Sequence, residues 1–148
     1  MKNSTSTQFN IFLAYPTCRK DESNFYRVTK NYINIGTQIK AYLIDWEKMD
    51  GLPKCNIYVP AEHEAFIHCA YTNEFLSEEQ IIAVNCEIID NCDLLVLFGG
   101  FKPTDNAAIQ EAIYARDKGV ALYTMPDLSP DAINALKFAI ICIIKSGE

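Results

Sequence analysis

Short apolar runs alternate along the chain with longer segments that carry helix signals. Each run lacks polar alternation and ends at a proline or glycine, which is typical of strands buried on both faces of a sheet. The predicted strands are residues 10–15, 56–59, 93–99 and 120–125. The pattern therefore indicates a sheet whose two faces are both covered.

The segments between these runs begin and end with recognisable helix signals. Ser77 and Gln80 have the spacing of a capping box, Ser129 precedes Pro130 at a predicted first helical position, and Gly119 follows a predicted last turn. In the first segment, apolar residues recur every three or four positions. The predicted helices are residues 22–48, 77–92, 104–118 and 129–145.

Strict alternation of strand and helix predicts a parallel sheet with helices on both faces. We expect one α/β domain over residues 1–148, a three-layer, doubly wound, Rossmann/flavodoxin-like fold with four to five strands. Such sheets bind ligands beyond the carboxyl ends of their strands, where the strand order reverses. This rule selects three predicted loops, residues 15–22, 60–76 and 99–108.

Composition narrows the class of protein. The chain has 148 residues, of which 49% are hydrophobic and 22% charged, and its net charge is −6. The apolar content excludes intrinsic disorder, and the acidic balance argues against a nucleic-acid partner, which a basic face would bind. The longest apolar run, residues 138–144, is shorter than the roughly 20 residues needed to cross a bilayer, so no membrane association is expected.

Six cysteines occur without a CxxC pair, and the polar start of the chain does not resemble a secretory signal. We expect reduced, mostly buried thiols in a soluble, cytoplasmic protein. Cys18 lies beside Arg19 and Lys20, which would lower the pKa of a nucleophilic thiol, but an incidental surface or capping cysteine is the simpler interpretation.

The loop after the third strand reads GGFKPTDNAAIQEA and contains neither a P-loop nor a GxGxxG dinucleotide motif. The helix after it carries Glu111 between small residues, Ala108 and Ala115, which leave space beside the carboxylate. A solvated helix glutamate is the simpler interpretation. His63 and His68 are five residues apart, the wrong spacing for a helical metal pair, so we expect no metal site. Because both nucleotide motifs are also absent, we expect no organic cofactor.

These features together resemble the nucleoside 2-deoxyribosyltransferase-like superfamily. The resemblance covers residues 9–126 and rests on FLAYP at the end of the first strand and on the spacing E-x-x-x-A-x-x-x-G formed by Glu111, Ala115 and Gly119. It implies that Glu111 attacks the anomeric carbon of a nucleoside, and that another base or water resolves the covalent glycosyl-enzyme. The implied substrate-binding residues are Tyr15, Pro16, Asn85, Gly99, Gly100, Asp105 and Asn106.

The chain departs from the family pattern at two positions. Ala107 occupies the position of a family glycine, and Asn85 that of an aspartate. Asp105 stands where the family's monophosphate hydrolases have serine, which implies an unphosphorylated nucleoside as substrate. The departures keep open a non-catalytic nucleoside- or nucleotide-binding module, and a structural interaction protein is a third alternative. Family members form dimers or larger assemblies, so a homo-oligomer is expected, with the apolar last helix as its interface.

Overall fold

Four parallel strands form a single sheet in the computed structural model, which describes residues 8–15, 22–50, 54–98 and 106–146. Side chains are described within these ranges except at residues 22–28, 47–50 and 106–107. The elements are β1 (Gln8–Ala14), α1 (Glu22–Asp50), β2 (Lys54–Tyr58), a short 3-10 helix η1 (Pro60–His63), α2 (Glu64–Thr72), α3 (Glu78–Ile89), β3 (Leu94–Phe98), α4 (Asn106–Asp117), β4 (Ala121–Met125) and α5 (Pro130–Ser146).

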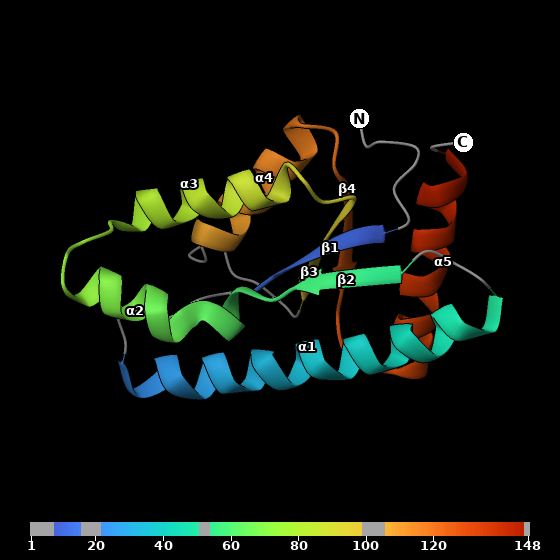
Figure 1. Cartoon of the computed structure of the whole chain (residues 1–148), viewed down its shortest axis with the longest axis horizontal. Helices are drawn as coiled ribbons and strands as arrows, with labels where there is room; N and C mark the ends of the chain where they lie inside the picture. Colours follow the sequence, from blue (N-terminus) through green and yellow to red (C-terminus); the bar gives the residue numbers. More distant parts are fainter. Residues whose placement is uncertain (1–7, 16–21, 51–53, 99–105, 147–148) are drawn as a thin grey trace.

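The strand order is β2-β1-β3-β4, with every neighbouring pair parallel. Helices α1 and α5 lie on one side of the sheet, and α3 and α4 on the other (Figure 1). The chain adds β2 on one side of β1 and then β3 on the other, so the order reverses between β1 and β3. The expected three-layer, Rossmann/flavodoxin-like α/β fold is thereby confirmed.

Alternating residues of β1 supply the two halves of the core. Ile11 and Leu13 pack toward α1 and α5, whereas Phe12 and Ala14 pack toward α3 and α4. All of β3 is buried as well. Because water reaches neither face of these strands, both sets of residues are apolar, and each fully buried large side chain contributes about 1.5–3 kcal/mol to stability.

The predicted helix ends have the expected geometry. Ser77 Oγ accepts a hydrogen bond from the Gln80 backbone N–H at 3.1 Å, and the Gln80 side chain accepts one from the Ser77 N–H at 2.8 Å. Ser129 Oγ accepts a bond from the Ala132 N–H, and α5 begins at Pro130. Gly119 follows α4 with a φ of +79°, a left-handed conformation that glycine adopts without strain.

One predicted loop is wrong, because η1 and α2 occupy most of residues 60–76. Helix α2 buries only Glu64 and Ala70, and its Phe66 is 77% exposed. A helix with so little buried surface has no apolar stripe, so hydrophobic periodicity could not reveal it.

The expectation of mostly buried cysteines is also wrong. Among the five described cysteines, Cys92 is buried, Cys55 and Cys86 are half-buried, and Cys69 and Cys142 are exposed. The last two lie on the solvent side of α2 and α5, and a small thiol is tolerated on either side of an amphipathic helix. None of these five forms a disulfide.

Membrane-spanning helices are not found among the described residues, since none combines the length and apolar character that a bilayer requires.

Candidate functional site

Glu111 lies in the second turn of α4 and is only 4% exposed. The interpretation of Glu111 as a solvated helix residue is therefore wrong. Asn85 of α3, also 4% exposed, donates a hydrogen bond from Nδ2 to Glu111 Oε2 at 2.9 Å. Such a bond offsets part of the cost of removing a carboxylate from water, and it orients the carboxylate plane.

Small and polar residues hold α3 and α4 together around this pair. Ala108 and Ala115 lie on the buried side of α4 at 0% exposure, so the helix can lie close to the sheet. One turn along from Glu111, the Tyr114 hydroxyl donates to the Asp90 carboxylate, whose two oxygens both lie 2.8 Å away. That bond raises the pKa of Tyr114 to about 12. The α3–α4 layer is thus fixed at two points.

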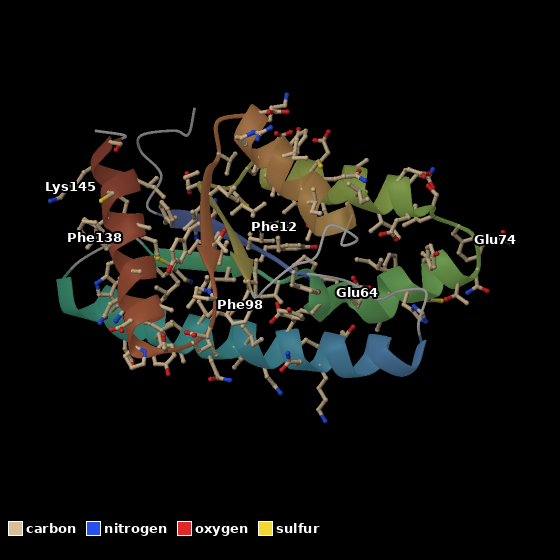
Figure 2. The ribbon with its side chains drawn as sticks, turned by 180° about the vertical axis from the view of Figure 1, so that it is seen from behind. Phe12, Glu64, Glu74, Phe98, Phe138 and Lys145 are labelled. Carbon is tan, nitrogen blue, oxygen red and sulfur yellow. The ribbon has the colours of Figure 1, made fainter. Side chains whose placement is uncertain are left out.

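A second buried carboxylate comes from the segment after β2. Glu64 is the first residue of α2 and is 2% exposed, and Figure 2 labels it at the start of that helix. A helix N-terminus carries partial positive charge, which favours a carboxylate there. Both buried glutamates therefore follow the carboxyl ends of strands, Glu64 after β2 and Glu111 after β3.

Tyr58, the last residue of β2, stacks its ring on two others. Its centroid lies 5.5 Å from that of Phe12 in β1 and 5.1 Å from that of His63 in η1, both in stacked orientation. Phe12 belongs to the core beneath α3 and α4, so Tyr58 packs on the same face of the sheet as Glu111.

The charges of the buried glutamates act on the side chains of Tyr58 and Cys86. Burial raises the pKa of Tyr58, and the charges of Glu64 and Glu111 raise it further. Burial also raises the pKa of the Cys86 thiol, and the Glu111 charge adds to that shift. We call the five residues the Glu111 cluster: Tyr58, Glu64, Asn85, Cys86 and Glu111.

Tyr15 lies on the other side of the sheet. It is 4% exposed, belongs to the core beneath α1 and α5, and stacks on Tyr32 of α1 with ring centroids 4.1 Å apart. Glu111 belongs to the α3–α4 layer, so the structure places the two residues on opposite faces. The role of Tyr15 as a base contact stays a prediction.

Several residues selected from the sequence lie outside the described part. These residues are Pro16, Cys18, Gly99, Gly100 and Asp105. The backbone of Asn106 begins α4, but its side chain is not described. The roles of all six residues in binding or catalysis stay predictions.

The two histidines lie in separate surroundings. His63 stacks on Tyr58, and His68 Nε2 lies 3.4 Å from Thr72 Oγ1 within α2. In the described ranges, no group of three or more His, Cys, Asp or Glu side chains could hold a metal ion.

Three members of the Glu111 cluster were not selected from the sequence: Tyr58, Glu64 and Cys86. Tyr58 had a usable signal, because it lies in a predicted strand just before a predicted ligand-binding loop. Glu64 had none, since it is one of three acidic or basic side chains in EHE, and only the packing of α2 distinguishes the buried one.

The cluster has the chemistry of a site for a nucleophile or a hydrogen-bonding ligand. It combines two acceptor carboxylates, an amide and a phenol at the carboxyl side of a parallel sheet, where such folds bind ligands. Comparisons of the chain with protein-family models, curated proteins and solved structures found no match, so the fold and these residues are the basis for inferring function.

Proposed function

We propose that the chain cleaves the N-glycosidic bond of a nucleoside, with Glu111 as the nucleophile, and passes the sugar to another base or to water. The observation that carries this proposal is the Glu111 carboxylate, buried in α4 and oriented by Asn85 at 2.9 Å. It also rests on the resemblance of residues 9–126 to the nucleoside 2-deoxyribosyltransferase-like superfamily.

In this reaction a Glu111 oxygen bonds to the anomeric carbon while the bond from that carbon to the base breaks. The bonding electrons leave with the base, which takes up a proton from water. Positive charge develops on the sugar, and an adjacent carboxylate stabilises it strongly where water is excluded. A nitrogen of a second base, or a water molecule, then attacks the anomeric carbon. The bond from that carbon to the Glu111 oxygen breaks, and the attacking group gives up its proton to solvent.

Charge favours an unphosphorylated substrate. Glu64 and Glu111 are two buried carboxylates in one cluster, and a 5′-phosphate would add negative charge near them. The predicted role of Asp105 as a sugar ligand points the same way. We therefore propose a nucleoside rather than a nucleotide.

A non-catalytic nucleoside-binding module is the second candidate. The amide of Asn85, where the family has an aspartate, bonds Glu111 and supplies no charge. Ala107 also replaces a family glycine. In this alternative the Glu111 carboxylate accepts a hydrogen bond from the ligand and attacks nothing.

Nucleobase release separates the two candidates. We would measure release from a panel of deoxynucleosides and ribonucleosides, with and without a second base, for the wild type, Glu111→Gln and a matched control, Glu79→Gln. Glu79 is exposed on α3. We expect Glu111→Gln to lose at least about 10³-fold in rate, because it removes the nucleophile, and Glu79→Gln to keep full activity.

Each contrary outcome has its own meaning. Release that survives unchanged in Glu111→Gln overturns the assigned nucleophile. A wild type that binds nucleosides, as shown by thermal stabilisation, but releases no base supports the binding module. Dependence of release on the second base identifies transfer, and its absence identifies hydrolysis.

We also propose that the protein is cytoplasmic and self-associates through α5. This helix is rich in apolar residues, yet its Phe138 is 68% exposed. A large apolar side chain exposed on such a helix is stabilised by burial against a second copy.

A further inference from the structure

We propose that Tyr58 is a further substrate-binding residue, whose hydroxyl donates a hydrogen bond to a sugar hydroxyl of the nucleoside that Glu111 attacks. This inference rests on the proposed function of the Glu111 cluster and adds a residue that neither the sequence pattern nor the resemblance assigned.

The position of Tyr58 is the first argument. It ends β2, the edge strand beside β1 and one strand away from the β1–β3 boundary where the strand order reverses, and it pairs in register with Phe12. Its ring packs on the core that contains Ala108, one turn before Glu111 in α4. A sugar held against Glu111 therefore lies on the same face of the sheet as this phenol.

The fixed orientation of the ring is the second argument. Phe12 and His63 stack on it at interplanar angles of 25° and 15°. Phe12 is 0% exposed, whereas Tyr58 is half-buried at the edge of that core. A phenol ring that already stacks on two neighbours loses little entropy when its hydroxyl binds a ligand, so the contact is pre-organised.

The charges around the phenol are the third argument. After burial, the charges of Glu64, Glu111 and Glu62 raise the pKa of Tyr58 above its ordinary value of 10.0. The hydroxyl thus stays protonated throughout the neutral range and remains a donor. Carboxylate oxygens accept hydrogen bonds, so Tyr58 adds a hydroxyl donor beside the two glutamates.

The test is Tyr58→Phe, which removes one oxygen atom and retains the ring that stacks on Phe12 and His63. With a 2′-deoxynucleoside we expect kcat/KM to fall by about three- to tenfold, the worth of one neutral hydrogen bond. Tyr42→Phe is the matched control, because Tyr42 is 43% exposed on α1. Thermal unfolding of both variants checks that the fold is intact.

Substrate analogues identify the acceptor. The same measurements use two analogues of the 2′-deoxynucleoside. The 2′,3′-dideoxy analogue lacks its 3′-hydroxyl, and the 2′,5′-dideoxy analogue lacks its 5′-hydroxyl. On the analogue without the contacted hydroxyl, we expect wild type and Tyr58→Phe to react equally. If the wild type binds nucleosides without releasing base, the same comparison is made with Kd in place of kcat/KM.

The failure of this inference differs from the failure of the proposed function. Normal base release with no loss in Tyr58→Phe overturns the inference alone. So does a loss that persists undiminished on both analogues, because the acceptor is then not a 3′- or 5′-hydroxyl. A wild type that neither releases base nor binds nucleosides overturns both.

Discussion

At the scale of residues, one hydrogen bond between Asn85 and Glu111 links the α3 and α4 helices in the buried layer. Each side chain is 4% exposed, and the bond between them joins two helices through residues that are 26 positions apart in the sequence. Polar groups buried this deeply are costly unless they are hydrogen-bonded, so each partner depends on the other. The pair therefore affects stability as well as the proposed chemistry.

Removing the amide should destabilise the fold. In Asn85→Ala the Glu111 carboxylate loses a buried donor, and we expect the free energy of unfolding to fall by about 1–3 kcal/mol. Urea denaturation measures the change, with Asn134→Ala, an exposed residue of α5, as the control. Combining Asn85→Ala with Glu111→Gln should cost less than the sum of the two separate losses. Strict additivity would contradict an energetic coupling between the two side chains.

At the scale of elements, α1 passes very close to the chain that leaves β2. A Cβ atom built on Gly36 would lie 2.6 Å from Val59 Cγ2, and Val59 is 0% exposed. Val59 directly follows Tyr58 and precedes η1. The small residue in α1 therefore helps to set where the β2–η1 segment, with its part of the Glu111 cluster, lies.

Gly36→Ala tests this close approach. Overpacking against the stiff Val59 side chain costs about 1–3 kcal/mol, which outweighs the roughly 1 kcal/mol that alanine adds through helix propensity. We expect a net loss of stability in urea unfolding. In a Val59→Ala background the new Cβ atom at position 36 has room, so Gly36→Ala should raise the free energy of unfolding instead. A gain in stability in the wild-type background would refute the contact.

The elements also differ in how well the pattern of residues predicted them. All four strands were found within two residues at each end, because burial on both faces leaves uninterrupted apolar runs. Helix α3 was found through its capping box, a local contact between Ser77 and Gln80. Helix α2 was missed because it buries so few residues, and Glu64 was missed with it.

At the scale of the whole molecule, some large apolar side chains remain exposed to solvent on the helices. Phe138 on α5 and Phe66 on α2 are 68% and 77% exposed. The two helices lie in separate parts of the molecule (Figure 1). Since α5 is the longer helix, with 17 residues against 9, and carries more apolar side chains, the proposed self-association through it can be tested against α2.

We expect Phe138→Lys to lower the molecular mass in solution to that of one chain, because a charge at the centre of an apolar contact is desolvated without a partner. Multi-angle light scattering measures the mass. Phe66→Lys makes the same change on α2 and should leave the assembly intact. A wild type with the mass of one chain, or an assembly that survives Phe138→Lys, would rule out an interface at this position.

The sequence by itself determined the order of the four strands and of helices α1, α3, α4 and α5, because local signals such as caps, prolines and apolar runs act over a few residues. It also determined that Glu111 follows the third strand in a helix with alanines around it. Tertiary structure decided which polar groups are buried together. Asn85, Glu64 and Tyr58 come from three separate elements, and Tyr15 lies on the opposite face of the sheet. These placements depend on how layers pack, and burial of a polar side chain is a property of that packing rather than of its neighbours along the chain.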